Sequence, residues 1–194
     1  MFYPDFNSNN VNILIYTNGS STDVNTQGIV YETLPAGMMN EIKNKASVDV
    51  LSENSTDNSI KADVRTILSK YNYSANIEII SQFGTDKLPM LATVKGTSMV
   101  PTLLDGQNII VLKTKDFKVG DIVVATHPTY GLIVKRLSII QGNQVYLTSD
   151  NKNVEVVNTQ TELSNGSVET IKVQKTPLNT WLPIGNVIGV VKNY

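Results

Sequence analysis

Residues 131–139 read Gly-Leu-Ile-Val-Lys-Arg-Leu-Ser-Ile, an apolar, β-branched run that follows a turn at Tyr130-Gly131. A short run of this kind between turn residues is typical of a β-strand. Comparable Val/Ile-rich segments lie on both sides of it, are separated by Gly-containing turns and include no convincing helical stripe. With Leu132–Ile140 itself, the expected strands are Asn108–Leu112, Asp121–Ala125, Gln144–Thr148, Val168–Val173 and Val187–Val191. We therefore predict a mainly β domain over residues 84–194.

Residues 1–83 differ from this β region in pattern and in charge. Apolar residues from Ile60 to Tyr71 recur at helical spacing behind capping candidates at Asp57-Asn58-Ser59, and a second helix is expected over Pro35–Ala46. This part holds five basic and nine acidic residues, whereas the remainder holds eleven basic and eight acidic ones. We predict an N-terminal α+β region of unknown role over residues 1–83, with a boundary near Gly84.

Short strands are also expected in the N-terminal region, at Val11–Tyr16, Gly28–Thr33 and Ile77–Ile79. Three stretches rich in Asn, Ser and Thr, at residues 7–12, 17–27 and 52–59, are expected to be surface loops. Two apolar segments, Leu88–Leu91 and Trp181–Ile184, are expected in the core, with a membrane-facing or substrate-binding surface as the alternative.

The composition excludes several kinds of chemistry. The chain has no cysteine and a single histidine, His127, so disulfides, thiol catalysis and thiolate metal sites are excluded and a His-based metal site has little to draw on. We expect no metal and no cofactor, and we expect His127-Pro128 to form an exposed turn. The formal net charge is −1, with no basic run of the kind that a phosphate backbone attracts. Nucleic acid is therefore not an expected partner.

The sequence also bears on a membrane location. No apolar run approaches the roughly 20 residues that span a bilayer, and the first residues lack the basic and apolar regions of a signal peptide. We expect either a cytosolic protein or one whose membrane anchor precedes this sequence.

Without cysteine, the available nucleophiles are hydroxyl groups, which need a neighbouring base. Ser98 lies in a turn punctuated by Gly96 and Pro101, and Lys135 lies inside an apolar strand. Strand alternation places Lys135 on one face with Ile133, Leu137 and Ile139. Apolar surroundings disfavour the ammonium, and lowering its pKa from about 10.4 to about 8 would raise the neutral fraction at pH 7 from about 0.04% to about 10%. Burial alone could thus make Lys135 a base.

The segment around these two residues resembles the catalytic core of type I signal peptidases, which are membrane-bound serine proteases with a Ser/Lys dyad. The resemblance spans roughly Leu88 to Val191. It rests on Gly96-x-Ser98-Met99-x-Pro101-Thr102-Leu103, Asp105-Gly106, Gly120-Asp121-Ile122-Val123, Val134-Lys135-Arg136, Ser149-Asp150-Asn151-Lys152 and Ile184–Gly189. It implies the all-β fold of the signal peptidases and LexA-type proteases.

The resemblance also implies roles for individual residues. Ser98 would be the nucleophile, with its backbone N–H in the oxyanion hole, and Lys135 the general base. Met99 would pack near the dyad, and Gly96 stands where some relatives place a serine that supplements the oxyanion hole. Ser149 replaces the usual glycine and is a candidate to support Lys135, because the Ser-x-Asp-Ser-Arg stretch that orients the lysine in relatives is missing.

The implied substrates are signal-peptide-bearing preproteins, cut in an extended segment that docks beside a strand such as Leu88–Val94. The implied location is a membrane anchor outside this sequence with an extracytoplasmic catalytic domain. The core also resembles the self-cleaving LexA-type proteases, through Val134-Lys135-Arg136-Leu137 and the following Gln141-Gly142-Asn143. An Ala36-Gly37 bond of the sort that those proteases cut is present. A third alternative is a catalytically silent peptide-binding module.

Overall fold

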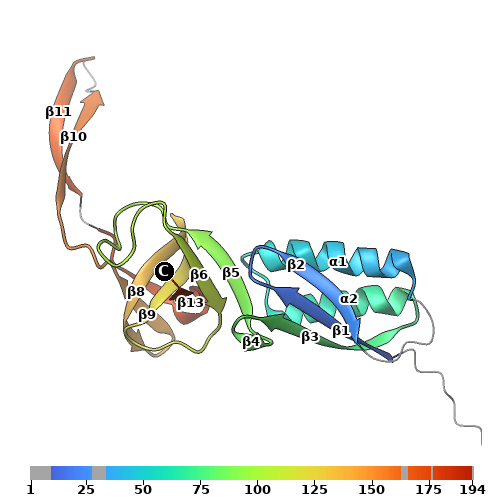
Figure 1. Cartoon of the computed structure of the whole chain (residues 1–194). Coiled ribbons are helices and arrows are strands. Elements are labelled where there is room, and N and C mark those ends of the chain that lie inside the picture. The colour runs from blue at the N-terminus through green and yellow to red at the C-terminus, as the bar shows by residue number, and fades with distance from the viewer. Residues whose placement is uncertain (1–9, 28–33, 163–165, 176, 194) are drawn as a thin grey trace, which may run out of the picture. The chain divides into compact units, whose positions relative to one another are not determined.

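The computed structural model describes residues 10–27, 34–162, 166–175 and 177–193 (Figure 1). The chain divides into two compact units. The first contains the described residues up to Thr93 together with Asn108–Phe117 and those from Ile188 onward, and the second contains Val94–Gln107 and Lys118–Val187. Gly84, near which the sequence predicts a boundary, lies in a short strand of the first unit, and the predicted boundary stays a prediction.

The first unit contains a four-stranded sheet whose strand order is β2-β1-β3-β4. Its parallel pair of β1 and β3 is antiparallel to β2 on one side and to β4 on the other. Along β1, alternate residues such as Val11, Ile13 and Ile15 are buried, so one face of the sheet meets the core. The bounds are β1 (Asn10–Thr17), β2 (Thr22–Gln27), β3 (Ser74–Ser81) and β4 (Gly84–Thr85).

Two helices, α1 (Ala36–Leu51) and α2 (Asp57–Lys70), lie side by side against this sheet (Figure 1). Helix α2 begins with a capping box in which the Thr56 side chain accepts from the Ser59 N–H and the Ser59 side chain accepts from the Thr56 N–H. The buried stripe of α2 joins the same core as the buried face of β1, which fixes a two-layer α/β arrangement.

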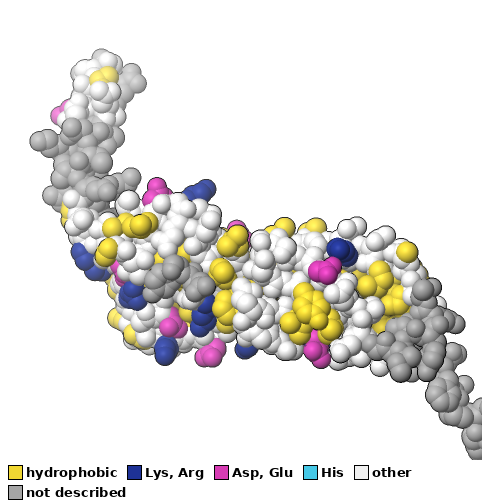
Figure 2. All heavy atoms as spheres, viewed as in Figure 1, with side chains coloured by type: hydrophobic (Ala, Val, Ile, Leu, Met, Phe, Trp, Pro, Cys, Tyr) yellow, Lys and Arg dark blue, Asp and Glu magenta, His cyan; other side chains and the backbone are white. Residues whose placement is uncertain are grey.

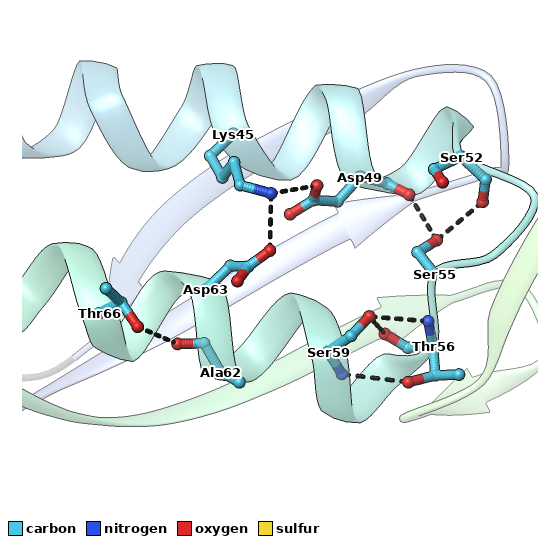
Figure 3. A network of polar contacts seen from close by, with 9 residues as sticks. All are labelled: Lys45, Asp49, Ser52, Ser55, Thr56, Ser59, Ala62, Asp63 and Thr66. Carbon is cyan, nitrogen blue, oxygen red and sulfur yellow. Dashed lines mark hydrogen bonds and ion pairs between the residues drawn. The ribbon is translucent and has the colours of Figure 1, made fainter.

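Polar contacts tie the two helices to each other (Figure 3). The Lys45 ammonium of α1 lies 2.5 Å from an Asp49 carboxylate oxygen and 2.6 Å from an Asp63 oxygen of α2. The pKa of Lys45 is raised, because Asp49 and then Asp63 accept hydrogen bonds from it. The loop after α1 is held by Ser55, whose hydroxyl donates to the carbonyl oxygens of Asp49 and Ser52.

Three further strands of the first unit follow one another in the order β13-β6-β5. Their bounds are β5 (Leu88–Thr93), β6 (Asn108–Lys113) and β13 (Val187–Asn193). A Cβ on Gly189 would lie 2.1 Å from the Leu112 carbonyl oxygen, so glycine is what allows β13 to approach β6 this closely.

The second unit carries strands in the order β12-β9-β8-β7, all antiparallel, and a separate two-stranded hairpin of β10 and β11. A short 3₁₀ helix, Ile184–Asn186, follows β12. The bounds are β7 (Ile122–His127), β8 (Gly131–Gln141), β9 (Gln144–Thr148), β10 (Glu155–Glu162), β11 (Val168–Lys175) and β12 (Thr180–Pro183).

The predicted fold class, a mainly β protein with an N-terminal α+β region, is confirmed. All six strands expected beyond Gly84 are present, as are both helices and the strands at Val11–Tyr16 and Ile77–Ile79. Helix α1 runs five residues beyond the predicted end at Ala46. The strand expected over Gly28–Thr33 lies outside the described residues.

Two expectations were wrong in part. The stretch of residues 17–27 was expected to be a loop, but Thr22–Gln27 forms β2 at the edge of its sheet, where only Val24 is buried. An edge strand with one solvated face can be polar at most positions, which is why composition concealed it. The two apolar segments expected in the core reach it only in part: Leu88, Met90 and Leu182 are buried, but Leu91 is 46% and Trp181 42% exposed. The Trp181 ring packs against Tyr146.

The surface and the helices give two further observations. On the face shown in Figure 2, Lys and Arg side chains are interspersed with Asp and Glu and form no single basic patch. No helix within the described ranges combines the length and apolar character that crossing a bilayer requires.

Candidate functional site

The structure brings Ser98 and Lys135 into direct contact. Ser98 lies in the turn between β5 and β6, and Lys135 comes from the middle of β8, thirty-seven residues later. The Lys135 Nζ lies 2.5 Å from the Ser98 Oγ. Strand alternation explains why the lysine points inward: Lys135 and Leu137 are the buried residues of β8, and only 4% of Lys135 is exposed.

Burial changes the acid–base behaviour of Lys135. Removal from water disfavours the ammonium and lowers the pKa of Lys135 to about 8, while the Asp150 carboxylate acts in the opposite direction. At this pKa about one molecule in ten carries the neutral amine at pH 7. The ammonium donates a hydrogen bond to the Ser98 Oγ, whereas the neutral amine can accept the hydroxyl proton. The contact therefore supplies what a serine needs to become a nucleophile.

The turn that carries Ser98 is held from several directions. Gly96 has a φ of +85°, a conformation that favours glycine, and its N–H donates to the Asp105 Oδ1 at 2.7 Å. Asn151 holds the other side, because its backbone N–H donates to the Ser98 carbonyl and its Nδ2 to the Thr97 carbonyl, each at 3.0 Å. Met99 is fully buried beneath the turn. Ser98 is thus fixed in place by its neighbours.

These bonds also bear on the oxyanion hole. The Gly96 N–H is occupied by Asp105, so it is not free to bind a developing oxyanion. Within the described part of the chain, no acceptor is recorded for the Ser98 N–H. Of the two candidate donors, Ser98 is therefore the one whose backbone can serve, and Gly96 contributes the shape of the turn.

Asp150 joins three segments around the dyad. Its carboxylate accepts from the Arg136 Nε at 2.7 Å, from the Arg136 Nη2 at 2.6 Å and from the Thr102 hydroxyl at 2.6 Å. These donors, chiefly Arg136, hold the pKa of Asp150 below its ordinary value despite partial burial. Arg136 points to the opposite face of β8 from Lys135 and also donates to the Gly120 carbonyl at 2.7 Å.

Ser149 is placed differently from the expected support for Lys135. It is 1% exposed, its hydroxyl donates to the Leu178 carbonyl at 2.8 Å, and its backbone N–H donates to the Asn179 Oδ1 at 2.8 Å. Its proton is thus directed to Leu178. The bonds recorded for Ser149 tie the segment before Asn151 to the one before β12.

A groove with a volume of about 680 Å³ opens beside Ser98. It lies entirely within the second unit. Its wall combines backbone and amide groups with apolar side chains, and Lys95 is its one charged residue among those described. The lining residues are Lys95, Gly96, Thr97, Ser98, Tyr130, Asn151, Asn153, Pro177, Leu178 and Asn179. A groove of this size and chemistry suits an extended polypeptide segment.

His127 was expected with Pro128 in an exposed turn, but it is the half-buried last residue of β7, and the exposed turn begins at Pro128. The His127 Nδ1 accepts from the backbone N–H groups of Thr129 at 3.1 Å and Tyr130 at 3.3 Å. The His127 side chain thus holds the turn that follows it. Among the described residues, no group of three or more His, Asp or Glu side chains could hold a metal ion.

Sequence reasoning identified Ser98 and Lys135 but gave no role to Tyr130 or to the ion pair of Asp150 with Arg136. The only available indication was the resemblance of the segment that contains Asp150. The pairing itself depends on which strands are neighbours, because β8 and β9 place residues 136 and 148 opposite each other.

Comparison with models of known protein families gives a match. A family model described as Peptidase S24-like matches residues 59–173, which is more than half of the chain and includes Ser98, Lys135 and Asp150. No curated protein matches the chain.

Proposed function

The chain belongs to the Peptidase S24-like family, a family of serine peptidases of the LexA and signal peptidase superfamily, and on that premise we propose that it is an endopeptidase with Ser98 as nucleophile and Lys135 as general base. The single observation that carries the proposal is the 2.5 Å contact between the Ser98 Oγ and the Nζ of a buried lysine whose pKa is lowered to about 8.

The reaction follows from this contact. The neutral Lys135 amine takes the Ser98 proton while the Oγ forms a bond to the carbonyl carbon of the scissile peptide. The resulting ammonium then gives that proton to the leaving amine as the C–N bond breaks, which leaves an acyl-enzyme. A water molecule, deprotonated by the same amine, then attacks the ester carbonyl. The tetrahedral intermediate collapses to the free acid as the Lys135 ammonium returns the proton to the Ser98 Oγ.

The oxyanion formed in both steps needs a donor. We propose the Ser98 N–H, for which the fixed turn provides a preorganised position. Donors of this kind are each worth about 10²–10³ in rate. Asp105 and Asn151 would contribute indirectly, since they hold the turn from its two sides.

The finer proposal is that the enzyme is of the signal peptidase I type and cleaves signal-peptide-bearing preproteins. The support is the resemblance of Ser98-Met99-x-Pro101-Thr102-Leu103 and Val134-Lys135-Arg136, together with a groove that suits an extended segment. On this proposal the catalytic domain works at a membrane surface, outside the cytoplasm, through an anchor beyond this sequence.

Self-cleavage is the second candidate, favoured by the family that the chain matches. The Ala36-Gly37 bond, however, lies in the first turn of α1, where the backbone is helical. Peptidases that add a substrate strand need an extended backbone. Self-cleavage at this bond would therefore require the start of α1 to unfold. For the third candidate, a catalytically silent peptide-binding module, no contact in the described structure gives specific support.

One experiment separates these candidates. The protein is incubated in detergent with a signal-sequence precursor, in parallel with Ser98→Ala, Lys135→Ala and the control Ser138→Ala, whose serine lies on β8 and bonds to Thr148. Cleavage by the wild type and the control, lost in the other two, supports the proposal. Equal results for all four proteins contradict it, and loss of mass from the chain itself identifies self-cleavage.

A further inference from the structure

Tyr130 lies in the same groove as the nucleophile. It stands in the turn between β7 and β8, lines the groove together with Ser98, and is 63% exposed. Single exposed aromatic residues are common on protein surfaces, so exposure alone does not indicate a role. The position beside Ser98, and the way the ring is held, are what distinguish Tyr130.

The Tyr130 ring is held in place by His127. The two ring centroids are 4.8 Å apart with an interplanar angle of 34°, which is a favourable separation for an aromatic pair. The His127 Nδ1 also accepts the Tyr130 backbone N–H and that of Thr129, which fixes the turn itself. An aromatic side chain that is ordered before binding loses little conformational entropy when a ligand packs against it.

The rest of the groove indicates what would pack there. Pro177 and Leu178 are the other apolar lining residues, Lys95 is the one charged residue, and no acidic side chain is among the described lining. A flat ring with apolar neighbours offers contact area to an apolar side chain and no counter-ion to a cation.

We propose that Tyr130 determines substrate specificity by packing against one apolar side chain, larger than alanine, of the bound peptide, and that His127 is its positioning residue. The proposal rests on the proposed function in one respect, that the groove binds peptide. On this proposal the β7–β8 turn forms a second recognition element, separate from the Ser98 turn and the dyad.

The test measures binding in the Ser98→Ala background, so that no peptide is cut. The probes are fluorescein-labelled eight-residue peptides of Ala and Ser, each with Phe at a different position, and fluorescence anisotropy gives their dissociation constants. At one position Phe should tighten binding about tenfold over Ala. Tyr130→Ala should remove that preference, and Tyr130→Phe should keep it. A preference that survives Tyr130→Ala, or no preference at any position, overturns the proposal.

The role of His127 is tested by two substitutions that separate the turn from the ring contact. Asn can supply the missing acceptor, as Asn18 does in this chain by accepting from the Ser20 and Ser21 N–H groups at 3.0 and 2.9 Å. His127→Asn should therefore keep the turn and reduce the Phe preference about threefold, and His127→Ala should reduce it further. An unchanged preference in His127→Ala would remove His127 from the proposal.

The two proposals fail in different ways. If the Tyr130-dependent preference is found but the wild type cuts none of the peptides or precursors, the groove inference stands and the peptidase proposal fails. If the wild type cuts precursors and Tyr130→Ala leaves both KM and kcat unchanged, the peptidase proposal stands and the groove inference fails. When both hold, Tyr130→Ala raises KM for the preferred peptide and leaves kcat within about twofold.

Discussion

Two lysine amines contact a serine hydroxyl within the described residues, and the two contacts differ in a way that the pKa of the lysine does not reveal. Lys135 contacts Ser98 in the second unit, and Lys113, at the end of β6, contacts the Ser55 hydroxyl at 3.0 Å in the first. Burial lowers the pKa of both lysines to about 8. A serine hydroxyl thus lies beside a lysine of lowered pKa in both places, but Lys135 is buried and Lys113 only half-buried, and the surroundings of the two hydroxyls differ.

The difference lies in the remaining partners. Lys113 also donates to the Ser52 and Ser55 carbonyl oxygens, and the Ser55 hydroxyl donates its own proton to the Asp49 carbonyl (Figure 3). Three acceptors around one Nζ match the three N–H groups of an ammonium, so this cation ties the loop after α1 to β6. The one partner recorded for the Lys135 Nζ in the described structure is the Ser98 Oγ, which lines the groove. The comparison teaches that a lysine of lowered pKa can act as a base towards a serine only where the serine hydroxyl does not already donate its proton to another acceptor.

The largest expected effect is on activity. Lys135→Met should reduce precursor cleavage by at least about 10³-fold, because both general-base steps are lost. Lys113→Met removes a lysine with the same pKa and should leave the rate within about threefold. Both are measured as initial rates on one precursor. Equal losses in the two variants would mean that the comparison between the lysines is mistaken.

The pH dependence should separate the two lysines next. The active form has a neutral Lys135, and with a pKa of about 8 the fraction of this form rises from about 1% at pH 6 to about half at pH 8. The cleavage rate should therefore rise roughly 50-fold between pH 6 and pH 8 and level off above pH 9. Lys113→Met should show the same profile. A rate that is flat between pH 6 and pH 10, or a midpoint that moves in Lys113→Met, would contradict the assignment of the base.

A smaller effect is expected from the turn around Ser98. Asn151→Ala removes the Nδ2 bond to the Thr97 carbonyl and should lower kcat about tenfold, because misplacement of Ser98 affects the chemical step. Ser55→Ala, the corresponding change in the other serine–lysine contact, should leave kcat unaltered. Steady-state kinetics on a fluorogenic peptide would reveal both, and a larger loss in Ser55→Ala would reverse the assignment.

The smallest effects concern stability, where the two lysine variants should change the free energy of unfolding in opposite directions. Replacing Lys135 by Met relieves the burial of an amine and should stabilise the fold by about 1–3 kcal/mol at pH 7. Lys113→Met leaves carbonyl acceptors unpaired and should destabilise it by about 1 kcal/mol. Thermal unfolding should therefore show midpoints that move in opposite directions, by about 2–4 °C per kcal/mol. Shifts of the same sign would show that the two environments are alike.

Stability itself should depend on pH through Lys135. The folded pKa of about 8 lies below the unfolded value, so between pH 8 and about 10.4 the unfolded chain binds more protons than the folded one. The free energy of unfolding should accordingly rise across this interval. Lys135→Met should reduce that rise, which denaturant titrations at pH 7 and pH 10 would detect.

The sequence predicts one member of the dyad on physical grounds and the other by resemblance. Strand alternation around Lys135 is a local pattern, so its burial follows from the neighbouring apolar residues. Ser98 lies in an irregular turn, for which no periodicity exists, and only the likeness of its segment to a known family singled it out. Lys113 had neither kind of indication, because its partners lie about sixty residues earlier and meet it only after the first unit has folded.

Prediction of the groove from the sequence meets the same limit. Tyr130 was seen as part of a turn, and nothing in the linear sequence relates it to residues 177–179 or to Ser98. Local patterns predicted most strands and both helices because burial repeats along each of them. Edge strand β2, the outward ring of Trp181 and the Asp150–Arg136 pair depend on which elements become neighbours, and this is decided by the whole chain.

The β10–β11 hairpin has a practical consequence. Its two strands bond to each other and to no other strand of the described structure. One residue separates β10 from Asn153, and one separates β11 from Pro177. Both of these residues line the groove. A fluorophore attached to one of these two strands would therefore leave β7, β8, β9 and β12 intact, while the hairpin stays connected to the groove through both of its ends. The β10–β11 hairpin is thus a suitable place to attach a label that reports when the groove is occupied.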